Sequence, residues 1–287
     1  MKVPNTKVLI AGCGDLGTKL AELLLQADFN VTGLRRSAQR DRRKFPLIIA
    51  DVTRPDSLEG LSALNPSIVV YCVSADAQSD ESYRLNYVEG LSNVLSALSA
   101  STDLKHVFFV SSTRVYGQVS ESLLDESDEP QPKDFGGMRL LEAEALLKEV
   151  ALHAKTQFHV TALRLSGIYG PGRSRMIDLA KSINTWPVNN DWTNRIHRDD
   201  AAAFMMFLIN KSLAEEMVDD CYVVTDSCPV PQYEVLNWIA TRMGCPNLQH
   251  SEVEGGKRLS NRRMLATNFK LRYPDYRVGY AALLETS

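Results

Sequence analysis

The sequence contains no long apolar run and no excess of basic charge. Its longest apolar runs, Ile68–Val73 and Val107–Val110, fall far short of the roughly 20 residues that span a bilayer. Near the N-terminus, no positively charged segment precedes an apolar stretch and a cleavage site, the pattern of a secretory signal. The chain has 32 basic and 35 acidic residues, a net charge of −3, so it lacks the electrostatic footprint of nucleic-acid binding. We expect neither a membrane nor a nucleic acid as partner.

Cysteine is also scarce and shows no ligand spacing. The five cysteines are Cys13, Cys72, Cys221, Cys228 and Cys245. Their number is odd, no C-x-x-C pair occurs, and several lie in apolar runs, as reduced core thiols do. No group of histidine, cysteine and carboxylate residues has the spacing of a metal site. These absences predict a cytoplasmic protein without a structural disulfide or a bound metal.

Short apolar runs alternate with helical patterns in the first half of the chain. The expected strands are Lys7–Ala11, Asn30–Leu34, Leu47–Ala50, Ile68–Val73, His106–Ser111 and His159–Leu165, and the expected helices are Leu16–Ala27, Tyr83–Leu98 and Phe135–His153. Such alternation predicts parallel strands with crossover helices, and continuous apolar runs suit strands buried on both faces. We therefore expect an α/β fold with a doubly wound parallel Rossmann sheet.

The rhythm changes after about residue 170, where glycine, proline and asparagine break the pattern into loops and short helices. A strand at Tyr222–Thr225 and a helix at Tyr233–Met243 follow. With about 150 residues per domain, 287 residues suggest two domains. We expect a Rossmann domain over 1–170 that takes back a strand near 221–226, and a smaller, interleaved, substrate-side subdomain over 171–287 with a substrate cleft between them. The acidic stretch Glu121–Glu129 is expected to be a solvated connection.

The clearest motif is a glycine-rich turn between the first strand and the first helix. Gly12, Gly14 and Gly17 form a G-x-G-x-x-G in which Asp15 and Leu16 open the helix. The first glycine permits a tight turn, the second lets a pyrophosphate approach the backbone, and the third lets helix and strand pack closely. A helix N-terminus offers free N–H groups and a positive dipole to phosphates. The motif predicts dinucleotide binding.

The end of the second strand points to one form of the dinucleotide. Where an acidic residue would accept the ribose 2′-hydroxyl of NAD, this chain has Arg35 and Arg36. Arginine binds phosphate oxygens in a bidentate manner, so the pair favours NADP(H), with NAD(H) as second choice. Alternatively, the two arginines only begin the basic loop Arg40–Lys44.

Further cofactor contacts are expected where later strands end. Asp51 and Val52 follow the third strand, where adenine is often contacted. Val73 and Ser74 end the fourth strand, beside the point at which open α/β sheets hold their ligands.

Four further parts of the chain match known patterns: Ser111–Gly117 is similar to SSxxVYG, Arg164–Arg173 to RLxxIYGPGR and Arg195–Asp200 to IHVDD, and Asn86 matches NVxGTxN. In these patterns the chain resembles the extended short-chain dehydrogenase/reductase superfamily, and within it the NAD-dependent epimerase/dehydratase-like proteins. The resemblance covers nearly the whole chain. It implies hydride transfer with a nicotinamide cofactor, and a dimer through the helix that begins at Phe135.

The catalytic pair of that superfamily is altered. The family uses Tyr-x-x-x-Lys on a helix, in which tyrosine transfers a proton and lysine holds the nicotinamide ribose. The matching positions are Phe135, which has no hydroxyl to exchange a proton, and Arg139, which can bind ribose but stays charged. Ser112 matches the hydroxyl that polarises the substrate oxygen, and Thr113 lies beside it. Tyr116 and Tyr169 are alternative proton donors.

Two functions follow from these residues and the resemblance. The first is an NADP(H)-dependent oxidoreductase or epimerase that acts on a small molecule, a nucleotide sugar or a similar polar hydroxyl or keto compound. The second is a dinucleotide-binding sensor or regulatory protein that has lost turnover. The altered residues at Phe135 and Arg139 favour the second.

Overall fold

The computed structural model describes residues 6–37, 45–120, 122–248 and 252–285, which form two compact units. The sheet unit comprises the described residues of Met1–Gly117, Gln131–Arg164 and Ala202–Tyr222. The second unit comprises those of Gln118–Pro130, Leu165–Ala201 and Val223–Ser287. The chain thus passes several times between the two units.

A seven-stranded parallel sheet with the order β11-β7-β5-β4-β1-β2-β3 carries the architecture. Its strands are β1 (Lys7–Ala11), β2 (Asn30–Arg35), β3 (Leu47–Ile49), β4 (Ile68–Tyr71), β5 (His106–Ser112), β7 (His159–Leu165) and β11 (Cys221–Val224). All of β4 and most of β1 are buried, as their continuous apolar runs predict. The order reverses between β1 and β4, each of which begins a run of strands outward. The expected doubly wound Rossmann sheet is confirmed.

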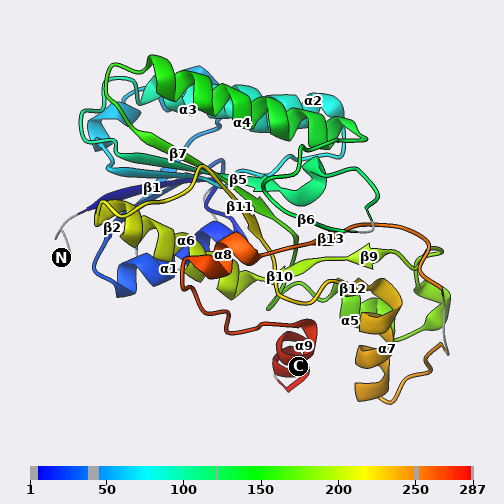
Figure 1. Ribbon diagram of the computed structural model, residues 1–287. Helices are drawn as coiled ribbons and strands as arrows, with labels where there is room; N and C mark the ends of the chain where they lie inside the picture. Colours follow the sequence, from blue (N-terminus) through cyan, green and yellow to red (C-terminus); the bar gives the residue numbers. More distant parts are fainter. Residues whose placement is uncertain (1–5, 38–44, 121, 249–251, 286–287) are drawn as a thin grey trace. The chain divides into compact units, whose positions relative to one another are not determined.

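Helices cover both faces of this sheet (Figure 1). One face carries α2 (Asp80–Tyr83), α3 (Gly90–Ala97) and α4 (Phe135–His153), and the other carries α1 (Asp15–Gln26) and the part of α6 (Arg198–Leu213) that belongs to the sheet unit. The helix α1 buries Leu16, Leu20 and Leu24 along one side. At the start of α4 the Asp134 carboxylate accepts a hydrogen bond from the Gly137 N–H at 2.9 Å, which caps the helix.

Short helical turns complete the sheet unit. They are the 3-10 turns Pro55–Leu58, Leu61–Leu64 and Thr113–Val115 and the π-helical turn Arg84–Glu89. The expected helix Tyr83–Leu98 therefore begins earlier, at Asp80, and passes through a π-helical turn before α3.

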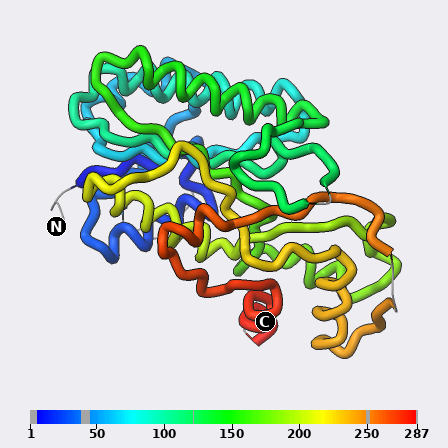
Figure 2. The backbone as a smooth tube through the Cα atoms, viewed as in Figure 1, coloured from blue at the N-terminus to red at the C-terminus, as the bar shows by residue number. Residues whose placement is uncertain are grey.

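The second unit contains three two-stranded sheets and four helices among the described residues. The pairs are β6 (Leu123–Leu124) with β13 (Arg258–Leu259), β8 (Gly167–Tyr169) with β10 (Arg195–His197), and β9 (Trp192–Thr193) with β12 (Val230–Pro231). The helices are α5 (Arg175–Ala180), α7 (Gln232–Arg242), α8 (Arg262–Ala266) and α9 (Tyr276–Glu285), with a 3-10 turn at Ile183–Thr185. An apolar core that includes Tyr169, Trp186 and Tyr280 holds this unit together. Figure 2 follows the chain as it leaves the sheet after β7 and returns to it at β11.

Two features of these parts differ from the sequence-based expectation. The long helix α6 was not expected, because apolar residues occur all round it and hide any apolar stripe in the sequence, although its buried residues Phe204, Met205 and Leu208 lie on one face. The acidic stretch is a solvated connection only in part: Ser127 and Glu129 are exposed, whereas the side chain of Glu126 is only 2% exposed. Its carboxylate accepts the Val223 N–H at 2.6 Å, and burial raises its pKa.

Candidate functional site

The glycine turn has the backbone geometry that its motif predicts. Gly12 has φ +88, and a Cβ there would lie 2.5 Å from the carbonyl carbon of Cys72 and the nitrogen of Val73. Both the left-handed conformation and the close approach of β4 therefore require glycine. At Gly17 a Cβ would lie 2.8 Å from the Gly12 carbonyl oxygen, so the third glycine lets α1 pack against the strand.

The middle of this turn is open. Gly14 is the N-cap of α1 and supplies no side-chain hydrogen bond, and a Cβ built on it would meet nothing within 4 Å. The first N–H groups of a helix have no partner within the helix, so they attract an anion. Asp15 in the first turn is exposed, whereas Leu16 is buried in the core. The fit of a phosphate here rests on backbone N–H groups and open space.

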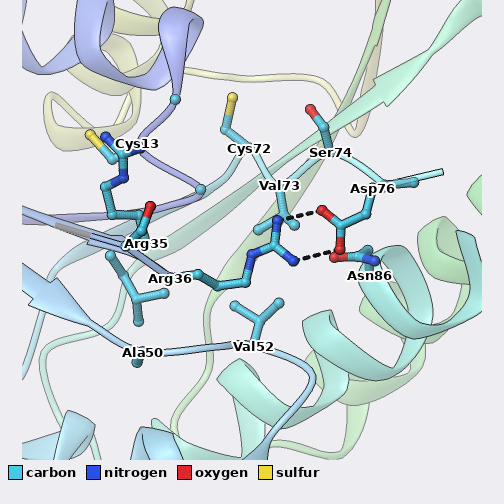
Figure 3. A pocket seen from close by; sticks show the side chains of 15 residues that line it. Cys13, Arg35, Arg36, Ala50, Val52, Cys72, Val73, Ser74, Asp76 and Asn86 are labelled. Atoms are coloured by element: carbon cyan, nitrogen blue, oxygen red, sulfur yellow. Dashed lines mark hydrogen bonds and ion pairs between the residues drawn. The ribbon is translucent and has the colours of Figure 1, made fainter. Parts of the chain in front are cut away.

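A cavity of about 390 Å³, the glycine-turn cavity, opens at this turn (Figure 3). It is lined by Gly12, Cys13, Gly14, Leu34, Arg35, Arg36, Ser37, Ala50, Val52, Cys72, Val73, Ser74, Ala75, Asp76 and Asn86. Seven of the expected cofactor residues lie in its wall: Gly12, Gly14, Arg35, Arg36, Val52, Val73 and Ser74. Asp15, Leu16, Gly17, Asp51 and Arg139 are not among the lining residues.

The Asp51 carboxylate stabilises the turn that follows β3. Its carboxylate Oδ1 accepts hydrogen bonds from the Thr53 N–H at 3.0 Å and the Thr53 hydroxyl at 2.8 Å. Such bonds shape an Asx turn. The turn places the neighbouring Val52 in the cavity wall, so of this expected pair only Val52 lines the cavity.

Arg36 forms a bidentate ion pair with Asp76 within the cavity wall (Figure 3). Both terminal nitrogens of the guanidinium donate to the carboxylate. The hydrogen bond from Arg36 lowers the pKa of Asp76, and that same bond raises the pKa of Arg36. The alternative basic loop Arg40–Lys44 lies outside the described residues, but Arg35 and Arg36 both line the cavity.

Phe135 packs into a cluster around Arg114. Its ring meets the ring of Tyr83 edge-on, with centroids 5.4 Å apart, and the Arg114 guanidinium lies 5.3 Å from the Phe135 centroid. Arg114 donates to the Asp134 carboxylate through Nε at 2.9 Å and to the Tyr83 hydroxyl at 2.7 Å. The Ser112 hydroxyl accepts the Arg114 N–H at 3.1 Å, and Thr113 is buried. Ser112 and Phe135 are thus linked through Arg114.

Arg139 is held by two carboxylates on the surface. Its Nε and one terminal nitrogen donate to Asp80 at 2.7 and 2.9 Å, and the other terminal nitrogen donates to Glu142 at 2.7 Å. These hydrogen bonds raise the pKa of Arg139 and lower that of Asp80. The structure does not bring Arg139 into the wall of the glycine-turn cavity.

The two alternative tyrosines are enclosed. Tyr116 is fully buried, and its hydroxyl accepts a hydrogen bond from Arg164 at 2.7 Å. Arg164 in turn pairs with the buried Glu144 at 2.7 Å. Tyr169 lies in the core of the second unit, and burial raises the pKa of its phenol far above the ordinary value. Both side chains are built into the packing of their units.

The sequence reasoning missed Asp76, which lines the cavity, and did not assign the lining residue Asn86 to the cofactor. Asp76 follows the segment after β4, where the ends of parallel strands gather ligands. Its position after a predicted strand could have marked Asp76 as a cavity residue, and the NVxGTxN pattern could have marked Asn86.

Within the described parts of the chain, no helix is long and apolar enough to cross a membrane. Among the same residues, no group of three or more histidine, cysteine or carboxylate side chains is placed to hold a metal ion. The five cysteines are free thiols.

Solved structures similar to this chain share its fold over nearly the whole length. A candidate NAD-dependent epimerase/dehydratase from Methylobacillus flagellatus is 50% identical, with 98% of each chain covered and a TM-score of 0.87. The UDP-glucose 4-epimerase of Thermus thermophilus, solved with NAD, is 19% identical, covers 94% of this chain and 95% of its own, and has a TM-score of 0.76. The UDP-N-acetylglucosamine 4-epimerase of Bacillus cereus is 17% identical, covers 96% and 94%, and also has a TM-score of 0.76. The last two likenesses establish the fold alone.

A family profile gives the classification. The NAD dependent epimerase/dehydratase family profile matches residues 8–219, which is most of the chain. No curated protein matches this sequence. The matched region begins in β1 and includes the glycine turn, the Ser112 segment and all of α4. The chain therefore belongs to the NAD-dependent epimerase/dehydratase family of the extended short-chain dehydrogenase/reductase superfamily.

Proposed function

We propose that this protein is a nicotinamide-dinucleotide-dependent oxidoreductase or epimerase that acts on a nucleotide sugar or a similar polar hydroxyl or keto compound. The observation that carries the proposal is the glycine-turn cavity, whose wall combines the turn before α1 with Arg35 and Arg36. The substrate class is supported by the two similar folds described as 4-epimerases of UDP-linked sugars.

The pyrophosphate and the 2′-phosphate of the dinucleotide bind at two different places in the cavity. The pyrophosphate lies at Gly14 and the N-terminus of α1, where the backbone N–H groups bind it without any side chain in the way. Arg35 and Arg36 bind a 2′-phosphate, so NADP(H) is preferred over NAD(H). The family description and the Thermus structure name NAD, so the comparisons favour NAD(H), which the arginine pair makes the alternative cofactor.

When bound, the nicotinamide supplies or accepts the hydride. The chain's own residues then orient the reacting oxygen. Ser112 ends β5 at the carboxyl edge of the sheet, and its hydroxyl is the group proposed to donate a hydrogen bond to that oxygen, with Thr113 beside it. Phe135 packs against Tyr83 and Arg114 but cannot carry a proton.

A second candidate function is a dinucleotide-binding sensor without turnover. The specific observation in its favour is that Arg139 is bound to Asp80 and Glu142, while Phe135 offers no hydroxyl. The tyrosine and lysine that transfer the proton in the family are thus both replaced, and Arg139, at the lysine position, lies outside the cavity wall.

One experiment separates the two functions. Turnover is measured on a panel of UDP-linked sugars with NADPH or NADP⁺, for the unmodified protein, S112A and the double variant F135Y/R139K. Activity of the unmodified protein that S112A removes, with dinucleotide affinity unchanged, supports the enzyme. Activity in F135Y/R139K alone supports the sensor, because positioned acid–base groups contribute about 10²- to 10⁴-fold in rate. Failure of all three to bind a dinucleotide contradicts both.

A further inference from the structure

The ion pair between Arg36 and Asp76 lies in the wall of the glycine-turn cavity, near the end of β1. Arg36 directly follows β2, and Asp76 lies in the segment that follows β4. In the sheet, β1 lies between β2 and β4. The pair therefore runs across the end of β1, where the glycine turn begins. Figure 3 shows the Arg36 side chain extended toward Asp76 within the cavity wall.

Asp76 is fixed by its backbone. The N–H groups of Asp76 and Ala77 both donate to the Ser82 hydroxyl oxygen, each at 3.1 Å. The Ser82 N–H in turn donates to Ser79, the N-cap of α2. These bonds hold the backbone of Asp76 in place, so its side chain meets Arg36 from a positioned backbone.

The carboxylate uses the same atoms that a phosphate would use. Arginine recognises phosphate by two parallel N–H donors, and both terminal nitrogens of Arg36 already donate to Asp76. The 2′-phosphate of the adenosine ribose can accept these two hydrogen bonds only after the Arg36 guanidinium has separated from Asp76. The ribose 2′-hydroxyl of NAD makes no such demand.

We propose that Asp76 determines cofactor preference by competing with the 2′-phosphate for Arg36. The inference rests on the proposed dinucleotide function of the cavity. The side chains of Arg36 and Asp76 are 51% and 46% exposed, and ion pairs this exposed are weak, so a phosphate with about two negative charges displaces the carboxylate. The competition lowers NADP(H) affinity by about two- to fivefold and leaves NAD(H) affinity unchanged. Asp76 thus reduces the NADP preference that Arg35 and Arg36 create.

Titration of full-length D76N with NADPH and with NADH tests this assignment. D76N keeps the side-chain shape but removes the charge that holds Arg36. We expect it to bind NADPH about two- to fivefold more tightly than the unmodified protein, with NADH affinity unchanged. D56N is the matched control, because Asp56 is similarly exposed and pairs with Arg54 at 2.8 Å but does not line the cavity. It should change neither affinity.

A double-mutant cycle with R36A separates competition from simple charge removal. In the R36A background, D76N should leave NADPH affinity unchanged, because the contested guanidinium is gone. An equal gain with and without Arg36 would overturn the proposal in favour of general repulsion. A loss of NADH affinity in D76N would also overturn it and make Asp76 a direct ribose ligand. Binding of both dinucleotides with no effect of D76N removes this inference alone, whereas no binding by the unmodified protein removes the proposed function with it.

Discussion

The glycine-turn cavity and the catalytic positions lie in the same unit and follow the same family pattern, but they retain it to different degrees. In the cavity, Gly12, Gly14 and Gly17 have the conformation, the openness and the close packing that phosphate binding needs. At the catalytic positions, Phe135 and Arg139 have replaced the two groups that move and stabilise a proton. The backbone features of the glycine turn follow from the fold itself, whereas the side-chain chemistry of the family's catalytic pair is altered by two substitutions.

Arg36 and Arg139 also differ between the cavity and the positions that match the catalytic pair. Arg36 and Arg139 each donate two hydrogen bonds to one aspartate, Asp76 and Asp80 respectively. Asp76 lines the cavity, so its pair with Arg36 is within reach of a ligand. Arg139 has a further partner in Glu142 and does not line the cavity. The place of each arginine in the fold, and not its residue type, therefore decides which of the two lines the cavity.

The largest expected effect is at Gly12. Replacement by alanine places a Cβ 2.5 Å from the backbone of Cys72 and Val73 at a positive φ, so we expect a loss of about 3 kcal/mol in unfolding free energy and no dinucleotide binding. Urea unfolding measures the loss. The control is G60A, where φ is +78 but nothing lies within 4 Å, and its cost should be about 1 kcal/mol. Equal costs would show that the approach of β4 is unimportant.

The double variant R35A/R36A should weaken NADPH binding at least tenfold, about 1.4 kcal/mol, and NADH binding much less. The reason is that only NADPH carries the phosphate that the two guanidiniums face. Calorimetric titration of both dinucleotides gives the two affinities. R54A serves as control, because Arg54 is exposed and does not line the cavity. An equal loss for both dinucleotides would contradict the 2′-phosphate assignment.

G14A should weaken both dinucleotides about equally, by roughly tenfold. A Cβ at this position meets nothing in the protein, so folding stability should change by less than about 1 kcal/mol. The added methyl group would instead occupy the approach of the pyrophosphate to α1. Titration and unfolding are measured on the same variant, and unchanged affinity for both dinucleotides would place the pyrophosphate elsewhere.

The smallest effect is expected at Arg139. R139A should change NADPH affinity by less than about twofold, because Arg139 is bound to Asp80 and Glu142 outside the cavity wall. A tenfold loss in the same titration would show that Arg139 reaches the cofactor, and the contrast between the two regions would then disappear.

The parts of the site that sequence could predict are local in the chain. The run from β1 through the glycine turn to α1 is contiguous, and its glycines have a physical reason at each position, so Gly12 and Gly14 were expected in the cavity and lie there. Arg36 was expected there because it directly follows the second strand. Phe135 and Arg139 were visible as departures from the pattern for the same reason.

What sequence could not predict depends on the strand order. Asp76 lies 40 residues after Arg36 in the chain. The two side chains meet because β2 and β4, the strands that precede them, are the two neighbours of β1 in the sheet. The contacts of Phe135 with Tyr83 and Arg114 join three distant segments in the same way. Glu126 had the composition of a solvated loop, and only the approach of β11 shows why it is buried.

A side-by-side titration of the purified protein with NADPH and NADH, followed by fluorescence, tests the central claim most directly. The account predicts micromolar binding of NADPH with at least a tenfold preference over NADH, about 1.4 kcal/mol. Tighter binding of NADH would contradict the role of Arg35 and Arg36. Binding of neither would mean that the fold persists without its cofactor, and both the enzyme and the sensor would be ruled out.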